Sequence, residues 1–213
     1  YGDAACDALF GKVVCHCSGA LPAAALADAV EYGAKAASVH PLFAISGGGS
    51  AQAKIGSALF TLEGDASALA TVSALLGACG VRHREIASSD KPLYHAAAVC
   101  ASNLAVGLFA SAQTMLERCG FNADEARDAL GPLFVGNCES IAERGPIDAL
   151  TGPIERNDSE TVMGHLLAFR DDPTLLKERD AYTALSRVVV EVAAAKHPGR
   201  DYSHIAEILR AAR

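Results

Sequence analysis

The chain has 213 residues, of which 51% are hydrophobic, and a formal net charge of −7 without any long basic run. This length allows one large domain or two small ones, and the composition is that of a globular protein. The charge argues against nucleic-acid binding through phosphate contacts, no apolar run predicts a membrane span, and the N-terminus does not resemble a signal peptide.

The first 87 residues alternate strand and helix signals. Apolar runs that end at turn residues predict strands at 13–17, 36–39, 58–62 and 81–86. Ala-rich segments that end at glycine predict helices at 22–32 and 66–79. Strands that alternate with helices predict an α/β part with a mostly parallel sheet.

From residue 88 the strand signals stop. Helices are predicted at 91–118, from Asn122 onward, and at 159–169, 174–196 and 203–212. Asn122 and Glu125 have the spacing of a capping box, whereas Gly131-Pro132 should kink or break its helix. Residues 145–158 are expected to form a loop. We therefore predict two domains, 1–88 and 89–213.

The seven cysteines are scattered and odd in number. Most stand in apolar surroundings, which predicts reduced core thiols in a cytoplasmic protein. Cys15, His16 and Cys17 invite comparison with a zinc site, but adjacent strand residues point to opposite faces and no Cys-x-x-Cys pair is present. We expect no metal.

The predicted helix at 91–118 carries polar residues among small apolar ones. Offsets of 4 and 11 bring Lys91, His95 and Ser102 to nearly one face, with Asn103 to the side. Lys can bind an anionic group, His can act as acid or base near neutral pH, and Asn can orient a carbonyl. Alternatively, Lys91 is an exposed first-turn residue, and His95 and Asn103 tie the helix to neighbouring loops.

Polar residues also follow two predicted strands. Ligands of open α/β sheets lie outside the carboxyl ends of strands, which favours a ligand near His16, Ser18 and His40. His40 could instead be a hydrogen-bonded turn residue before Pro41. The run Gly47-Gly48-Gly49 completes no phosphate-binding motif and is expected to be a surface loop.

A third group of candidates lies in the loop at 150–158. Gly152-Pro153 fixes a turn, and Arg156 and Asp158 can pair with each other or bind polar substrate groups. Asp158 could equally cap the helix that begins at Ser159. His165, further along that helix, could be a packed histidine.

Five pieces of sequence together resemble a known family. They are His-Cys-Ser-Gly-Ala at 16–20, Ser-Val-His-Pro-Leu at 38–42, Leu-Phe-Thr-Leu-Glu-Gly-Asp at 59–65, Lys-Pro-Leu-Tyr-His-Ala-Ala-Ala-Val at 91–99 followed by Ser-Asn at 102–103, and Ala-Leu-Thr-Gly-Pro-Ile-Glu-Arg-Asn-Asp at 149–158 followed by His165. In this order they resemble the Rossmann-like oxidoreductases whose C-terminal helical part is the domain of unknown function 2520, DUF2520.

The resemblance implies a partial Rossmann-like sheet followed by an all-α domain similar to the C-terminal domain of 6-phosphogluconate dehydrogenase. It also implies an NADP-type cofactor, a small-molecule substrate and a homodimer formed through the helical domain. The residues near the cofactor would be His16, Ser18, Gly19 and His40. The catalytic residues would be Lys91, His95 and Asn103, and those around the substrate Thr151, Gly152, Arg156 and Asp158.

The chain departs from the family pattern in two places. Arg156-Asn157-Asp158 stands where the family has Arg-Gly-Asp, and Asn tolerates the left-handed backbone that such a turn needs. No Gly-x-Gly-x-x-Gly unit is present, so we expect the cofactor-phosphate half of the site to be missing. The expected function is an NAD(P)-dependent oxidoreductase. The alternative is a non-catalytic helical dimerisation or ligand-binding module on a Rossmann remnant.

Overall fold

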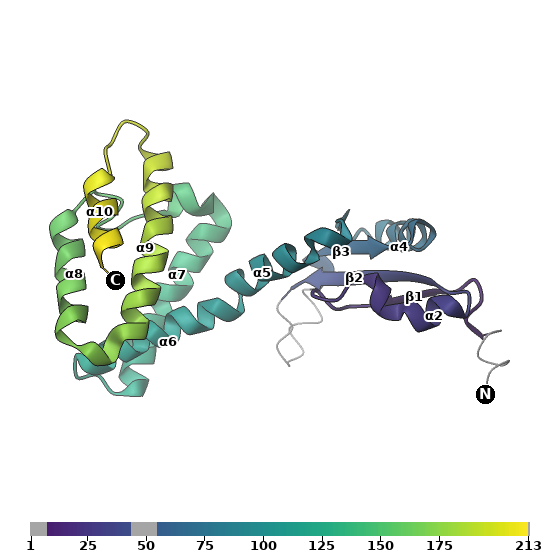
Figure 1. Cartoon of the computed structure of the whole chain (residues 1–213), viewed down its shortest axis with the longest axis horizontal. Helices are drawn as coiled ribbons and strands as arrows, with labels where there is room; N and C mark the ends of the chain where they lie inside the picture. The colour runs from purple at the N-terminus through teal and green to yellow at the C-terminus, as the bar shows by residue number, and fades with distance from the viewer. Residues whose placement is uncertain (1–7, 44–54, 213) are drawn as a thin grey trace. The chain divides into compact units, whose positions relative to one another are not determined.

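A computed structural model describes residues 8–43 and 55–212 of the chain (Figure 1). The chain divides into two compact units, Tyr1–Leu104 and Ala105–Arg213. The helix that begins at Lys91 belongs to the first unit, whereas the domain boundary predicted from sequence lies before it, at residue 88. The predicted surface loop Gly47-Gly48-Gly49 lies outside the described residues.

The first unit is built on a four-stranded sheet. In chain order the strands are β1 (Val13–His16), β2 (Lys35–Leu42), β3 (Leu59–Gly64) and β4 (His83–Glu85), and they are neighbours in this same order. The β1–β2 and β3–β4 pairs are parallel, and the β2–β3 pair is antiparallel. The predicted mostly parallel α/β sheet is therefore confirmed.

Helices cover the central strands of this sheet. They are η1 (Ala23–Leu26), α2 (Ala27–Glu31) and α4 (Ala66–Ala78), with a short turn η2 (Ile55–Ser57) before β3. The Asp65 side chain caps α4 by accepting from the backbone N–H groups of Ser67 and Ala68. Ala36, Ala37 and Ser38 are consecutive buried residues of β2, as expected for a strand that is covered on both faces.

The connection between the two units is helical. It contains η3 (Ser88–Asp90), α5 (Lys91–Ala101) and α6 (Asn103–Arg118), and Pro92 lies in the first turn of α5 as predicted. The prediction of one continuous helix is wrong, because Ser102 leaves helical geometry with φ −127° and ψ −79°. Its hydroxyl donates to the carbonyl of Ala98 at 2.6 Å, the local bond by which serine competes with helix continuation.

The second unit is all helical. After α6 it contains α7 (Ala123–Ala149), α8 (Ser159–Asp171), η4 (Pro173–Leu175), α9 (Leu176–Lys196) and α10 (Ser203–Ala211). Helix α9 packs against α7, α8 and α10. Buried residues of α8, α9 and α10, among them Val162, Ala193 and Leu209, form the hydrophobic core of this unit.

Helix α7 begins as predicted but ends differently. Asn122 and Glu125 form the capping box, with the Asn122 side chain accepting from two backbone N–H groups and Glu125 accepting from that of Asn122. The expected break at Gly131-Pro132 is wrong: the helix continues through Pro132 and tolerates the loss of the one backbone hydrogen bond that proline cannot donate. Regular geometry is interrupted instead at Gly145, whose φ of 77° and ψ of 167° lie in a region that favours glycine.

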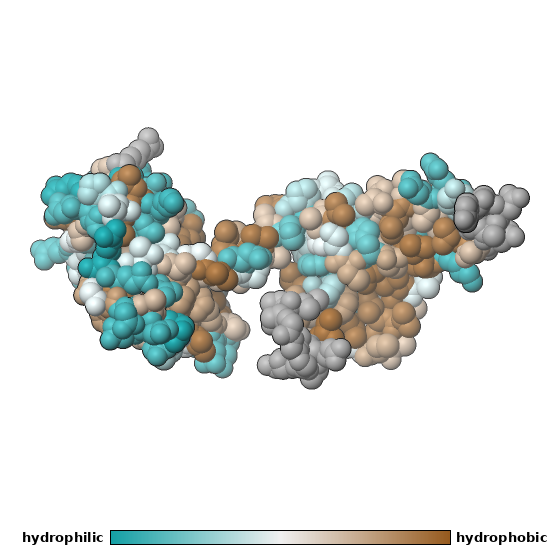
Figure 2. All heavy atoms as spheres, turned by 90° about the horizontal axis from the view of Figure 1, so that it is seen from below, coloured by the Kyte–Doolittle hydropathy of each residue, from teal (hydrophilic) through white to brown (hydrophobic). Residues whose placement is uncertain are grey.

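Apolar residues lie at the surface of both units (Figure 2). No residue of α6 is buried in the described chain, and in α7 only Ala126 and Ala149 are.

The helical stretch Ser88–Arg118 is also long and apolar enough to cross a membrane by length and composition alone, although polar residues interrupt it. One such stretch is weak evidence for a membrane span, because packing helices meet the same criterion.

The predicted core thiols are also incorrect. Six cysteines fall within the described residues, and all six are free and exposed: Cys15, Cys17, Cys79, Cys100, Cys119 and Cys138. Although their sequence neighbours are apolar, these cysteines lie at positions that no other described part of the chain covers. Burial of a small thiol depends on which face of a strand or helix it occupies, and composition does not decide that.

Gly64 is the position of the first unit where an added methyl group should be most harmful. Its φ is 145°, and a Cβ would lie 2.4 Å from the Ala36 carbonyl oxygen and 2.8 Å from the Ala37 Cα. We expect Gly64→Ala to lower the free energy of unfolding by about 2–4 kcal/mol. Gly77→Ala, a helical position with open space, should change it by less than about 1 kcal/mol. Urea unfolding of both variants tests this, and equal midpoints would contradict it.

Candidate functional site

Five side chains of the first unit come together where α5 meets strand β2. Ser38 and His40 are two residues apart in β2 and therefore share one face of the sheet. Lys91, Tyr94 and His95 lie three and four residues apart in α5 and therefore share one face of the helix. We call these five residues the α5–β2 cluster.

Lys91 is almost completely buried, with 2% of its surface exposed. Its ammonium donates to Ser38 Oγ at 2.8 Å and to the Ser18 carbonyl at 3.4 Å, and Ser38 Oγ donates to the same carbonyl at 3.2 Å. Burial lowers the pKa of Lys91, and the nearby Glu63 carboxylate opposes part of that change. The alternative that Lys91 is an exposed first-turn residue is therefore wrong.

The two histidines of the cluster close around Gly19. A Cβ on Gly19 would lie 2.8 Å from His40 Nε2 and 3.0 Å from His95 Nδ1, so only glycine fits without displacing the rings. His40 Nδ1 lies 2.7 Å from the Tyr94 hydroxyl. His95 Nδ1 is buried and has no hydrogen-bond partner among the described residues. An unpaired buried nitrogen is costly and marks His95 as a group that a ligand could satisfy.

His40 lies inside β2, which continues to Leu42, rather than in a turn before Pro41. Burial lowers its pKa first, followed by the positive charge of Lys91 and then by His95. The neutral imidazole is therefore favoured, and its bond to Tyr94 fixes the ring orientation.

The loop after β1 uses its own polar side chains to hold its shape. His16 Nε2 donates to the Pro22 carbonyl at 3.0 Å, while His16 Nδ1 accepts from the Ser18 N–H at 3.2 Å. Ser18 Oγ accepts from the N–H groups of Ala20 and Leu21. His16 and Ser18 thus shape the loop that brings Gly19 to the histidines.

The predicted substrate loop lies in the second unit. Asp158 caps α8, accepting from the N–H of Thr161 at 3.0 Å and from its hydroxyl at 2.7 Å, so the capping alternative is confirmed. These bonds lower the pKa of Asp158. Asn157 adopts φ 62°, the left-handed conformation expected of an Asn that replaces glycine. Thr151 and Arg156 are exposed, and Gly152 adopts φ 101°.

Two further histidine pairs belong to the second unit. His197 Nε2 lies 2.5 Å from Glu155 Oε1, which lowers the pKa of Glu155 and fastens the loop to the end of α9. His165 is exposed rather than packed in the core, and its Nδ1 lies 2.9 Å from the Tyr182 hydroxyl. The second unit therefore has its own polar group near Asp158.

The structure gathers some of the predicted site residues and leaves others apart. The first unit brings together Gly19, His40, Lys91 and His95. Asn103 is exposed beyond the break at Ser102, and its Oδ1 accepts a hydrogen bond from the Ser102 hydroxyl. Ser38 and Tyr94 belong to the cluster without having been predicted from the sequence. Their positions, two residues before His40 in a strand and three after Lys91 in a helix, were the available signals.

The residues of the site decide whether a metal ion or a dinucleotide could bind there. Within residues 8–43 and 55–212, no group of three His, Cys, Asp or Glu could hold a metal ion. His95 Nδ1 is an unpartnered polar atom that the carboxamide of a nicotinamide could satisfy if the rings around Gly19 moved apart. Phosphates find no suitable group in the α5–β2 cluster, because Lys91, its basic residue, is buried and bound. The cluster thus offers one polar atom to a carboxamide and no group to the phosphates.

The charge coupling between Lys91 and His40 gives a direct prediction. In Lys91→Met we expect the pKa of His40 to rise toward its ordinary 6.5, because one lowering charge is gone. Lys35→Met, which removes an exposed lysine of the same strand, should leave it unchanged. NMR titration of the imidazole Cε1–H measures both.

The same shift fixes how stability depends on pH. Because the pKa of His40 is lower in the folded chain, the unfolded chain binds more protons over that range. The first unit should therefore lose stability as pH falls from 6.5 through the lowered value. An unchanged His40 titration in Lys91→Met would contradict the coupling.

Comparison with known proteins identifies the family and the fold. The sequence matches the Domain of unknown function DUF2520 over residues 58–189, more than half of the chain. Protein TM1727 from Thermotoga maritima has a similar structure, with a TM-score of 0.70 and 26% identity over 86% of this chain and 70% of that chain. The "putative NADP oxidoreductase BF3122" from Bacteroides fragilis has a TM-score of 0.62 and 24% identity over 84% and 65%. No curated protein matches the sequence.

The expected fold is confirmed by these similarities: a Rossmann-like α/β part followed by a helical C-terminal part. This chain spans 70% and 65% of the lengths of the two solved proteins. The expected resemblance is confirmed as well, and the chain belongs to the DUF2520 family.

Proposed function

We propose that the chain is the substrate-binding and proton-transfer part of an oxidoreductase that uses a nicotinamide cofactor of the NADP type. The observation that carries this proposal is the convergence of His40 and His95 on Gly19, with Lys91 bonded to the carbonyl of the preceding Ser18. The similarity of the fold to BF3122, which is described as a "putative NADP oxidoreductase", supports the same class of reaction. When bound, such a cofactor supplies or accepts a hydride.

Within the α5–β2 cluster, His95 is the proposed proton-transfer group. Its buried Nδ1 has no partner among the described residues, and an imidazole nitrogen can serve as a general acid or base. Lys91 is buried and already bonded to two oxygens, so its proposed role is to position the Ser18 carbonyl and Gly19 and to keep His40 neutral. The loop of the second unit with Thr151, Gly152, Arg156 and Asp158 is proposed to bind a small polar substrate.

A non-catalytic function is the second candidate. Two observations favour it. The α5–β2 cluster offers no free basic group for phosphates, and the polar network around Lys91 would also serve only to hold α5 against the sheet. The module would then serve in dimerisation or ligand binding. A cytoplasmic location belongs to both proposals, since six exposed free thiols persist best in a reducing compartment.

The two candidates differ in how the chain responds to the cofactor. We expect millimolar NADPH to shift the NMR signals of His95 and His40. 2′-Phospho-ADP-ribose, which lacks the nicotinamide, should shift neither signal. His95→Ala should abolish the stabilisation seen in a parallel thermal-shift titration, which is about 2.7 kcal/mol at a hundredfold excess over Kd.

The outcomes separate the proposals cleanly. If NADPH changes neither histidine signal nor stability, the chain does not use this cofactor and the non-catalytic function is favoured. If 2′-phospho-ADP-ribose produces the same shifts, the cluster does not recognise nicotinamide, and the assignment of His95 is wrong.

We also propose that the chain forms a homodimer through α6 and α7. These helices leave large apolar side chains exposed: Val106, Leu108, Leu133, Val135, Ile141 and Ile147. Helix α6 meets α7 through an edge-to-face contact of Phe109 and Phe134, but neither helix has a buried core of its own. An uncovered apolar face of this kind is typical of an obligate interface, which resembles a domain core cut in half.

Charged substitutions test the dimer. We expect Val106→Glu and Leu133→Glu to convert a dimer to monomers, because each places a carboxylate in an apolar contact. Leu75→Glu, at an equally exposed apolar position on α4, is the control and should leave the mass unchanged. Light scattering after size exclusion measures the mass, and a monomeric wild type would refute the proposal.

A further inference from the structure

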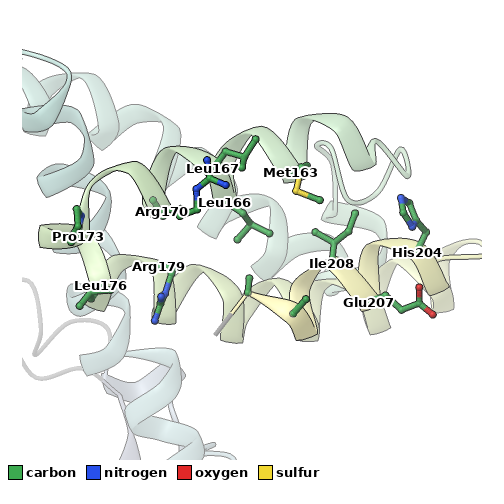
Figure 3. A pocket seen from close by; sticks show the side chains of 13 residues that line it. Met163, Leu166, Leu167, Arg170, Pro173, Leu176, Arg179, His204, Glu207 and Ile208 are labelled. Carbon is green, nitrogen blue, oxygen red and sulfur yellow. The ribbon is translucent and has the colours of Figure 1, made fainter.

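A groove of about 580 Å³ runs through the second unit between α8, the beginning of α9, and α10 (Figure 3). It belongs to the second unit, whereas the α5–β2 cluster belongs to the first, and its residues carry none of the roles discussed above. The volume falls in the range of small-molecule sites, roughly 300–1,000 Å³. We call it the α8–α10 groove.

Its walls are apolar. Leu166, Phe169 and Ile208 belong to the buried core and form the inner surface. Met163 and Leu167 are each 40% exposed and Leu176 is 49% exposed, although all three line the groove. A ligand with an apolar body would cover these side chains and gain the free energy of removing them from water.

Charge is distributed unevenly along the groove. Arg170 and Arg179 lie toward one end, near Pro173 and Leu176, whereas His204 and Glu207 lie toward the other (Figure 3). Each arginine also bonds the next residue, Arg170 to Asp171 at 3.2 Å and Arg179 to Asp180 at 2.7 Å. Both aspartates are highly exposed and neither lines the groove.

These ion pairs, each with a highly exposed aspartate, are weak and can be replaced by a ligand. Contacts between neighbouring surface charges contribute about 0–1 kcal/mol to stability, so they do not prevent a ligand from binding to the guanidinium instead. Arg179 is the better placed of the two, because only 23% of its side chain is exposed. A carboxylate bound there would be partly shielded from water, which strengthens charge-assisted hydrogen bonds.

We propose that the α8–α10 groove binds a carboxylate with an unbranched apolar chain, its head on Arg170 and Arg179 and its tail along α8 toward Met163. Along α8 the distance from residue 170 to 163 is roughly 10 Å at 1.5 Å per residue, which suits a tail of about eight to ten carbons. Glu207 and His204 limit the tail at the far end. This site does not depend on the proposed oxidoreductase activity.

The charges and the size of the groove favour this ligand over a second copy of the chain. A stable protein interface needs about 800 Å² from each partner, and the extended apolar face for that purpose is on α6 and α7. Two arginines from different helices toward one end of a small groove suit a single anionic head instead.

Isothermal titration of the full chain with decanoate and with decylammonium tests the proposal. The two probes share a tail and differ in the sign of the head. The chain carries a net charge of −7, so non-specific adsorption would favour decylammonium. We expect one decanoate per chain, bound at least about tenfold more tightly than decylammonium, the factor that corresponds to 1.4 kcal/mol.

Matched variants locate the site. The double variant Arg170→Gln, Arg179→Gln should weaken the binding of decanoate at least about tenfold. Arg170→Gln alone should also weaken binding, and because Arg170 is highly exposed this single variant should still fold. Arg210→Gln, on α10 but outside the lining, is the control and should bind as the wild type does. Equal affinity for both probes, no binding at millimolar decanoate, or arginine variants that bind normally would each overturn the proposal. So would a loss of dimer mass in Leu167→Glu, since a second copy would then occupy the groove.

Discussion

Burial of the Lys91 ammonium is the constraint around which the first unit is arranged. A charged group removed from water is costly unless other groups compensate it, and here Ser38 Oγ, the Ser18 carbonyl and the field of Glu63 do so. The three partners come from β2, from the loop after β1, and from β3. One side chain on α5 thereby fixes the position of this helix against three parts of the sheet.

The position of the histidines follows from that constraint. The hold of Lys91 on the Ser18 carbonyl determines where Gly19 lies, and Gly19 has no side chain to separate His40 from His95. Tyr94 then fixes the ring of His40 at 2.7 Å. The second unit repeats this arrangement in His165 and Tyr182, with nearly the same perpendicular ring geometry. In each pair the bond occupies Nδ1 and leaves Nε2 as the ring nitrogen that can meet a ligand.

Features set by local chemistry were predictable from sequence. The capping box at Asn122, the cap at Asp158 and the left-handed backbone of Asn157 each depend on a few adjacent residues. The burial of Lys91 was not predictable, because its partner Ser38 is 53 residues away in sequence. The exposure of the cysteines likewise depends on how whole elements pack, and the break at Ser102 depends on whether its hydroxyl bonds the helix or another group.

The stability of α7 needs a contribution from outside this helix. It contains Gly131, Pro132 and Gly136, and each glycine costs about 1 kcal/mol and the proline about 3 kcal/mol relative to alanine in a helix interior. Helices in water owe most of their stability to packing of an apolar face, yet α7 buries only Ala126 and Ala149. Its contact with α9 therefore leaves a deficit that the capping box offsets only in part. Covering the apolar side chains of α6 and α7 in the proposed dimer would add to the stability of α7, so the dimer interface and this helix are physically linked.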